Sequence, residues 1–184
     1  MKATGIVRRI DELGRVVIPK EIRRTLRIHE GDPLEIYVDR EGGVILKKYS
    51  PIGELGDFAK EYAESIHQSV NHIAVICDKD SVIAVSGSGK KELMDKPIST
   101  NLEELIQNRQ KYTAGIADGG ELLPVTADDN QEKYTAQVIV PILASGDAIG
   151  AVVLLSREHG AKICETDIKV CETAASFMGK QMEN

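Results

Sequence analysis

The sequence of 184 residues predicts an α+β protein in two parts, a small mainly-β unit followed by a larger α+β unit. Charge changes sign between them: residues 1–48 carry 11 Lys and Arg against 8 Asp and Glu, whereas residues 49–184 carry 12 against 21. Periodicity also changes, because short β-rich runs dominate the first part and helical spacing begins near residue 55. We therefore expect one domain over residues 1–50 and another over residues 53–184.

The first part is expected to form four short strands and one helix. Runs with alternating or β-branched residues predict the strands, and Gly14 suits the turn between the first two because it can take a positive φ. Pro19 fits the first position of a helix, where its missing N–H needs no partner. The order strand, strand, helix, strand, strand corresponds to residues 4–10, 15–18, 19–27, 34–38 and 44–48.

This first part has too few apolar residues for a generous core of its own and too many to leave in water. A unit of about 48 residues seldom folds alone without disulfides, metal or a partner subunit. An obligate homodimer is the simplest solution. The apolar residues are Ile6, Val7, Ile10, Val16, Val17, Ile18, Ile22, Leu26, Ile28, Leu34, Ile36, Val38, Val44, Ile45 and Leu46.

Most cations of the first part gather on one helical face and on the strands beside it. Like charges at helical spacing repel by roughly 0.2–0.5 kcal/mol per pair, so stability does not explain this face. A solvated face is one interpretation; the other, which we favour, is recognition of duplex DNA by a dimer that doubles the set. The helical cations are Lys20, Arg23, Arg24 and Arg27, opposite Ile22 and Leu26, and the others are Arg8, Arg9 and Arg15.

Composition and motif spacing exclude several other classes. The longest uninterrupted apolar run, residues 151–155, is far shorter than the roughly 18 residues of a membrane span. N-terminal arginines disfavour a signal peptide, and three cysteines without C-x-x-C spacing favour reduced thiols, so we expect a cytoplasmic protein. The histidines lack ligand spacing, and Ser86–Lys91 departs from a phosphate-binding loop at Ala84 and Lys91. We expect a turn there, no metal site, no cofactor and no enzymatic activity.

The second part alternates helices and strands in an α+β plan. Apolar residues at helical spacing predict its first and last helices, and a pair of β-rich runs joined by residues 144–147 predicts a central hairpin. The expected helices are residues 55–70, 102–108 and 165–182, and the expected strands are residues 73–77, 82–85, 136–143 and 148–155.

The first part closely resembles the AbrB family of bacterial transition-state regulators. The matching segments are TGIVRRIDELGRVVIPKEIRRTL (residues 4–26), LEIYV (34–38) and VILKKY (44–49). The resemblance implies a swapped-hairpin dimer, with DNA-contacting arginines at Arg8, Arg15, Arg23 and Arg24 and a basic residue accepted at Arg9. Lys20 and Arg27 lie outside that pattern and rest on the charge argument alone. The fold also serves antitoxins with a disordered toxin-wrapping tail, which the second part does not resemble.

The second part looks like a GAF domain, chiefly through VPILASGDAIGAVVL (residues 140–154). It lacks the cyclic-nucleotide signature of that family, so its effector, if any, is left open. The combination resembles AbrB-type regulators with a GAF-like domain from spore-forming bacilli. This resemblance implies activation and repression of genes in the developing forespore, by a protein that binds double-stranded DNA at the nucleoid.

We expect the two outer helices of the second part to join swapped dimers into a tetramer. Their alanine-rich stripes, with Ala59, Ala63, Ala174 and Ala175, allow close approach between helices of different subunits or simple cover of the sheet. Two rival roles remain for the second part: a small-molecule sensor that sets DNA affinity, or an assembly module that only multiplies DNA-binding heads.

Overall fold

A computed structural model describes residues 5–54, 56–128 and 133–183. Contacts divide the chain into two compact units, Met1–Tyr49 and Ser50–Asn184, which are described separately below. Within the described ranges, no helix has both the length and the apolar character that a membrane span requires.

The first unit contains helix α1 (Lys20–Thr25) and an antiparallel hairpin of β1 (Leu34–Val38) and β2 (Val44–Lys48). The hairpin strands match the predicted bounds. Their loop is closed by the side chain of Asp39, whose Oδ1 accepts hydrogen bonds from the backbone N–H of Glu41 at 2.9 Å and of Gly43 at 2.7 Å. The predicted helix is confirmed but shorter, because Pro19 has an extended ψ of 146° and serves as its N-cap.

The two strands predicted over residues 4–10 and 15–18 are wrong for the single chain. Residues 5–18 join no sheet, and backbone hydrogen bonds within residues 11–15 form a turn. An extended segment becomes a strand only when a neighbouring strand accepts and donates its backbone hydrogen bonds. Among the residues that the structure describes, no strand pairs with this segment.

The first unit has almost no interior of its own. Among its described residues only Pro19 is buried, whereas Val7 is 85% exposed and Val38 is 74% exposed. Large exposed apolar side chains cost free energy in proportion to their area in water. The unit therefore presents an apolar surface that needs a cover.

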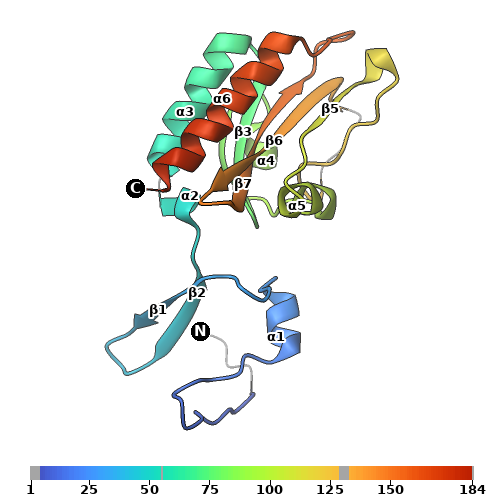
Figure 1. The fold of residues 1–184 in the computed structure, drawn as a ribbon. Helices are drawn as coiled ribbons and strands as arrows, with labels where there is room; N and C mark the ends of the chain where they lie inside the picture. Colours follow the sequence, from blue (N-terminus) through green and yellow to red (C-terminus); the bar gives the residue numbers. More distant parts are fainter. Residues whose placement is uncertain (1–4, 55, 129–132, 184) are drawn as a thin grey trace. The chain divides into compact units, whose positions relative to one another are not determined.

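The second unit is built on a five-stranded antiparallel sheet in the order β4-β3-β7-β6-β5 (Figure 1). The long hairpin of β6 and β7 lies near its centre, and both strands are almost wholly buried. The strands are β3 (Ile73–Asp78), β4 (Val82–Ser86), β5 (Tyr112–Gly115), β6 (Ala136–Ala144) and β7 (Asp147–Ser156).

Helices cover both faces of this sheet. Helices α3 and α6 lie side by side over one face (Figure 1), and α5 packs with the connecting segments on the other. Three helices and four strands were predicted with bounds accurate to about two residues, whereas α2, α4, η1 and β5 were not predicted. The helices are α2 (Pro51–Glu54), α3 (Gly56–Val70), α4 (Lys90–Leu93), α5 (Thr100–Gln107) and α6 (Glu165–Gln181), and η1 is a 3-10 helix (Ile116–Asp118).

Successive residues of each strand belong to two separate cores, as the two-residue period of a strand requires. Ile73, Val75 and Cys77 face α5, whereas Ala74 and Ile76 face α3 and α6. The core between the sheet and helices α3 and α6 contains the four alanines that were expected to suit contact between subunits. Ala59, Ala63, Ala174 and Ala175 are at most 2% exposed, so they cover the sheet and do not form a surface for another subunit.

The glycine-rich stretch before α4 is a turn, as predicted. Strand β4 ends at Ser86, Gly87 and Gly89 have φ of 99° and 94°, and α4 begins at Lys90. Positive φ at both glycines reverses the chain at a position where other residues would be strained. The stretch therefore has a structural explanation that requires no phosphate.

Candidate nucleic-acid interface

Helix α1 displays the predicted cations but lacks the predicted buried face. Lys20 and Arg24 are exposed, and Arg23 is half-buried. Ile22 is also half-buried, whereas Leu26 is 56% exposed, so no residue of the helix is buried in the single chain. The apolar side of α1 thus joins the uncovered surface of the first unit.

Arg27 follows the C-cap residue Leu26 of α1 and has a backbone conformation that usually belongs to glycine. Its φ is 50°. The N–H of Arg27 donates to the carbonyl oxygen of Arg24 at 3.3 Å, and the N–H of Ile28 donates to the carbonyl oxygen of Arg23 at 2.8 Å. This pair of bonds is the Schellman arrangement, in which the left-handed position favours Gly. Lys48 Nζ donates to the Arg27 carbonyl oxygen at 2.7 Å and so ties this helix end to β2.

Arg15 lies in the turn at residues 11–15 and is held there by Asp11. Asp11 Oδ1 accepts from the N–H of Leu13 at 3.0 Å and of Arg15 at 2.8 Å, and Oδ2 accepts from Arg15 Nε at 2.8 Å. These bonds, from the Arg15 backbone first and its guanidinium second, hold the pKa of Asp11 below its ordinary value. The side chain of Arg15 nevertheless remains 70% exposed.

Arg8 and Arg9 precede this turn and are both exposed. Arg8 Nη1 donates to the carbonyl oxygen of its neighbour Val7 at 3.1 Å. The segment that carries these two arginines joins no sheet.

Several carboxylates of the first unit accept backbone N–H groups and so shape its turns. Asp11 and Asp39 accept backbone N–H groups in their own loops. Asp32 accepts from the N–H of His29 at 2.7 Å and lies 3.5 Å from Lys48 Nζ. These three acidic side chains are thereby fixed at turns, and Asp11 and Asp32 also pair with Arg15 and Lys48.

The cysteines and the potential metal ligands can be compared with the sequence-based expectations. No group of three or more potential metal ligands occurs among the described residues. Cys77 and Cys171 are buried, and burial raises the pKa of the Cys77 thiol to about 12 and that of Cys171 well above its ordinary value. Both thiols stay protonated at neutral pH and pack as small apolar groups.

An aromatic cluster on the outer side of α3 and α6 was missed in the sequence. Phe58 and Tyr62 stack with ring centroids 5.6 Å apart, and Phe177 lies 5.4 Å from Tyr62 and 6.1 Å from Phe58. Phe177 is 41% exposed. The spacing of four residues between Phe58 and Tyr62 is the one signal that could have predicted half of this cluster.

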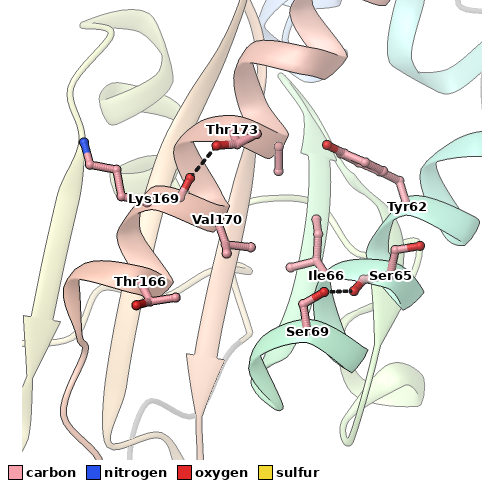
Figure 2. Close-up of a pocket in the computed structure, with 9 residues that line it drawn as sticks. Tyr62, Ser65, Ile66, Ser69, Thr166, Lys169, Val170 and Thr173 are labelled. Carbon is pink, nitrogen blue, oxygen red and sulfur yellow. Dashed lines mark hydrogen bonds between the residues drawn. The ribbon is translucent and has the colours of Figure 1, made fainter.

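A shallow groove of about 300 Å³ runs beside the cluster, between α3 and α6 (Figure 2). Three of its hydroxyl groups are used within their own helices: Ser65, Ser69 and Thr173 each donate to the carbonyl four residues earlier. The lining is Tyr62, Ser65, Ile66, Ser69, Thr166, Lys169, Val170, Thr173 and Ala174.

In comparisons with known proteins, different family models match the first and the second unit of the chain. The family model "Stage V sporulation protein T C-terminal, transcription factor" matches residues 54–183, and "Antidote-toxin recognition MazE, bacterial antitoxin" matches residues 7–54. Stage V sporulation protein T of Bacillus subtilis (strain 168) is 56% identical over 183 residues, which cover 100% of this chain and 99% of that protein.

Two further similarities each concern one part of the chain. The transition state regulatory protein AbrB of Bacillus subtilis (strain 168) is 72% identical over 51 residues, or 28% of this chain and 52% of that protein. A crystal structure of the Thermosynechococcus elongatus PixJ GAF domain matches with a TM-score of 0.56 and 13% identity, over 74% of this chain and 89% of that one. The second unit thus has a GAF-like fold, as predicted.

A small basic unit joined to a GAF-like unit defines a two-domain transcription factor, a class distinct from enzymes. Within that class, the chain belongs to the stage V sporulation protein T family. The match to the antitoxin model covers the first unit only, and the family assignment rests on the whole chain.

Proposed function

We propose that the chain regulates transcription by binding specific sites on double-stranded DNA through its first unit, as a homodimer. One observation carries the proposal: a unit with almost no buried residues displays a group of exposed or half-buried cations, while several of its carboxylates are occupied in turns. The proposed contacts are Arg8, Arg9, Arg15, Lys20, Arg23, Arg24 and Arg27.

The exposed apolar surface supports the dimer. A second copy would cover Val7, Val17 and Val38, which are 85%, 70% and 74% exposed in the single chain. Burying such side chains stabilises by roughly 1.5–3 kcal/mol each. The same partner would offer strand neighbours to residues 5–18, which is the arrangement that a swapped hairpin supplies.

The aromatic cluster supports assembly of two dimers into a tetramer. With the alanines buried, Phe58, Tyr62 and Phe177 form the apolar surface that α3 and α6 present to a second copy. Aromatic side chains dominate the energetics of such interfaces. Sedimentation equilibrium should show a tetramer for the full chain and a dimer for Phe177→Glu.

The variant Val17→Glu tests the proposed dimer of the first unit. In an isolated chain Val17→Glu would be harmless, because the side chain is exposed; in the proposed dimer it buries a charge and should release subunits or unfold the unit. Monomeric wild-type protein, or a Val17→Glu variant with unchanged assembly and stability, would overturn the dimer.

We further propose the biological setting of the Bacillus subtilis relative: activation and repression of sporulation genes in the forespore, with the protein cytoplasmic and bound at the nucleoid. The support is 56% identity along the whole chain to a protein named for sporulation. Genome-wide DNA occupancy during sporulation, compared with transcript changes in a deletion strain, tests both signs of regulation.

Binding itself is tested by salt titration with a duplex that the wild-type chain selects from a random-sequence pool. Arg23→Ala and Arg24→Ala should each weaken binding and reduce the slope of log K against log salt by about one to two units per dimer, since each removes two phosphate contacts. Lys133→Ala in the second unit is the control and should leave the slope unchanged. Equal slopes for all three variants would reduce the cations to a solvated face.

The sensor alternative has less support. The sheet face opposite α3 and α6 is covered by large side chains, including Ile98, Leu102 and Ile106, which are at most 1% exposed. A ligand on that face would have to displace them. A thermal-shift screen of the full chain tests the alternative, because a ligand of the folded state raises its melting temperature.

A further inference from the structure

The carboxylate of Asp11 has two distinct sets of partners in the turn that carries Arg15. Oδ1 accepts two backbone N–H groups, from Leu13 at 3.0 Å and Arg15 at 2.8 Å. Oδ2 accepts the side-chain Nε–H of Arg15 at 2.8 Å. One oxygen therefore shapes the turn, and the other restrains a guanidinium.

The backbone beneath this pair is also fixed. The N–H of Asp11 donates to the carbonyl of Arg15 at 3.0 Å, the N–H of Gly14 donates to the carbonyl of Asp11 at 3.0 Å, and Gly14 has a φ of 76° that suits glycine. The Arg15 guanidinium is thus held through one nitrogen on a rigid turn while 70% of the side chain stays exposed.

We propose that Asp11 is a positioning residue for DNA recognition: it presents the Arg15 guanidinium to the duplex in a fixed orientation. The proposal rests on the proposed function of the first unit. An Nε bond leaves the terminal fork of the guanidinium for a phosphate or a guanine edge, which it can contact with two parallel hydrogen bonds. Restraint before binding also lowers the entropy lost when the contact forms.

Charge alone gives the opposite expectation. A carboxylate beside a DNA-binding surface repels phosphates, so its removal should tighten binding if Asp11 only closes the turn. Positioning predicts that its removal weakens binding. The sign of the change therefore separates the two roles.

The variant that isolates the second oxygen is Asp11→Asn. Its amide oxygen can still accept the two backbone N–H groups, while its NH₂ group cannot accept from Arg15 Nε. Glu12→Gln is the matched control, because it removes one negative charge from the same turn at an exposed neighbouring residue. Each variant is made in the full chain, and affinity is measured for the duplex that the wild-type protein selects from a random pool.

Asp11→Asn should weaken binding about three- to tenfold per dimer, the range that two restrained exposed pairs can supply, whereas Glu12→Gln should leave it equal or tighter. In an Arg15→Ala background, Asp11→Asn should no longer weaken binding, since no guanidinium remains to be positioned. Arg15→Lys should bind about as weakly as Arg15→Ala, because lysine keeps the charge without the fork.

Three results would overturn the proposal: tighter binding by Asp11→Asn to the extent seen for Glu12→Gln, equal weakening with and without Arg15, or full function of Arg15→Lys. The Arg15→Lys arm keeps the test decisive even if Asp11→Asn disturbs the turn. A wild-type chain that selects no duplex would refute the proposed function itself, and that result is distinct from all three.

Discussion

Replacing Arg27 by glycine should stabilise the protein and weaken its binding to DNA. A non-glycine residue in the left-handed region costs roughly 1–2 kcal/mol, and Arg27 has a φ of 50° at the end of α1. The added freedom of glycine in the unfolded chain offsets about 0.5–1 kcal/mol of the gain. The net increase in unfolding free energy should be up to about 1.5 kcal/mol per chain, while each proposed dimer loses two cations.

Denaturant unfolding of the full chain at fixed protein concentration measures the stability change. Arg27→Ala is the matched control, because it removes the same charge and keeps the strained backbone. Both variants should reduce the salt slope of DNA binding by about two units per dimer, and only Arg27→Gly should be more stable than wild type. Equal stability of the two variants would refute the strain argument, and unchanged DNA slopes would remove Arg27 from the interface.

Three further predictions concern the second unit. Gly179→Ala should destabilise it by about 1–3 kcal/mol or more in thermal unfolding, since the added Cβ would lie 1.9 Å from the backbone oxygen of Leu143. Burial opposes ionisation of Asp167, but hydrogen bonds from Cys164 and the nearby His72 outweigh it and lower the pKa of Asp167 below its ordinary value of 3.8. The contribution of this carboxylate to the free energy of unfolding is therefore fully present at neutral pH and is lost as the pH falls below about 4. Asp167→Asn should make the free energy of unfolding less dependent on pH in that range. A thiol reagent should modify Cys164, which is exposed, and spare the two buried cysteines until the protein unfolds.

The local sequence pattern predicted a helix or strand correctly where the segment packs against neighbours close in sequence or has a strong helical period. The hairpin of β1 and β2 has both strands and its Asp39-closed loop within residues 34–48, and its bounds were predicted correctly. The long helices α3 and α6 were predicted from a 3.6-residue period that the sheet beneath them enforces. Strand β5 has only four residues, which is too short for a clear two-residue period, and it pairs with β6 more than twenty positions later. The local sequence pattern therefore did not predict it.

The other differences between prediction and structure have separate causes. The segments predicted as strands within residues 5–18 have the right composition, but composition does not supply a neighbouring strand, and none of the described residues forms one beside them. Alanine spacing on α3 and α6 was consistent with two uses, and burial against the sheet resolved it. The contact between Asp11 and Arg15 spans four residues, yet no helical or strand period points to it, because the turn geometry creates it.

The lack of a private interior in the first unit has a consequence for control in the cell. In the proposed dimer, the DNA-binding surface takes shape only when two chains meet, so its formation depends on chain concentration. Early in synthesis, scattered copies would lack a reading head altogether and would be open to proteolysis. DNA recognition by the proposed dimer would then rise more steeply than the amount of chain, so that the timing of expression itself acts as a regulatory input.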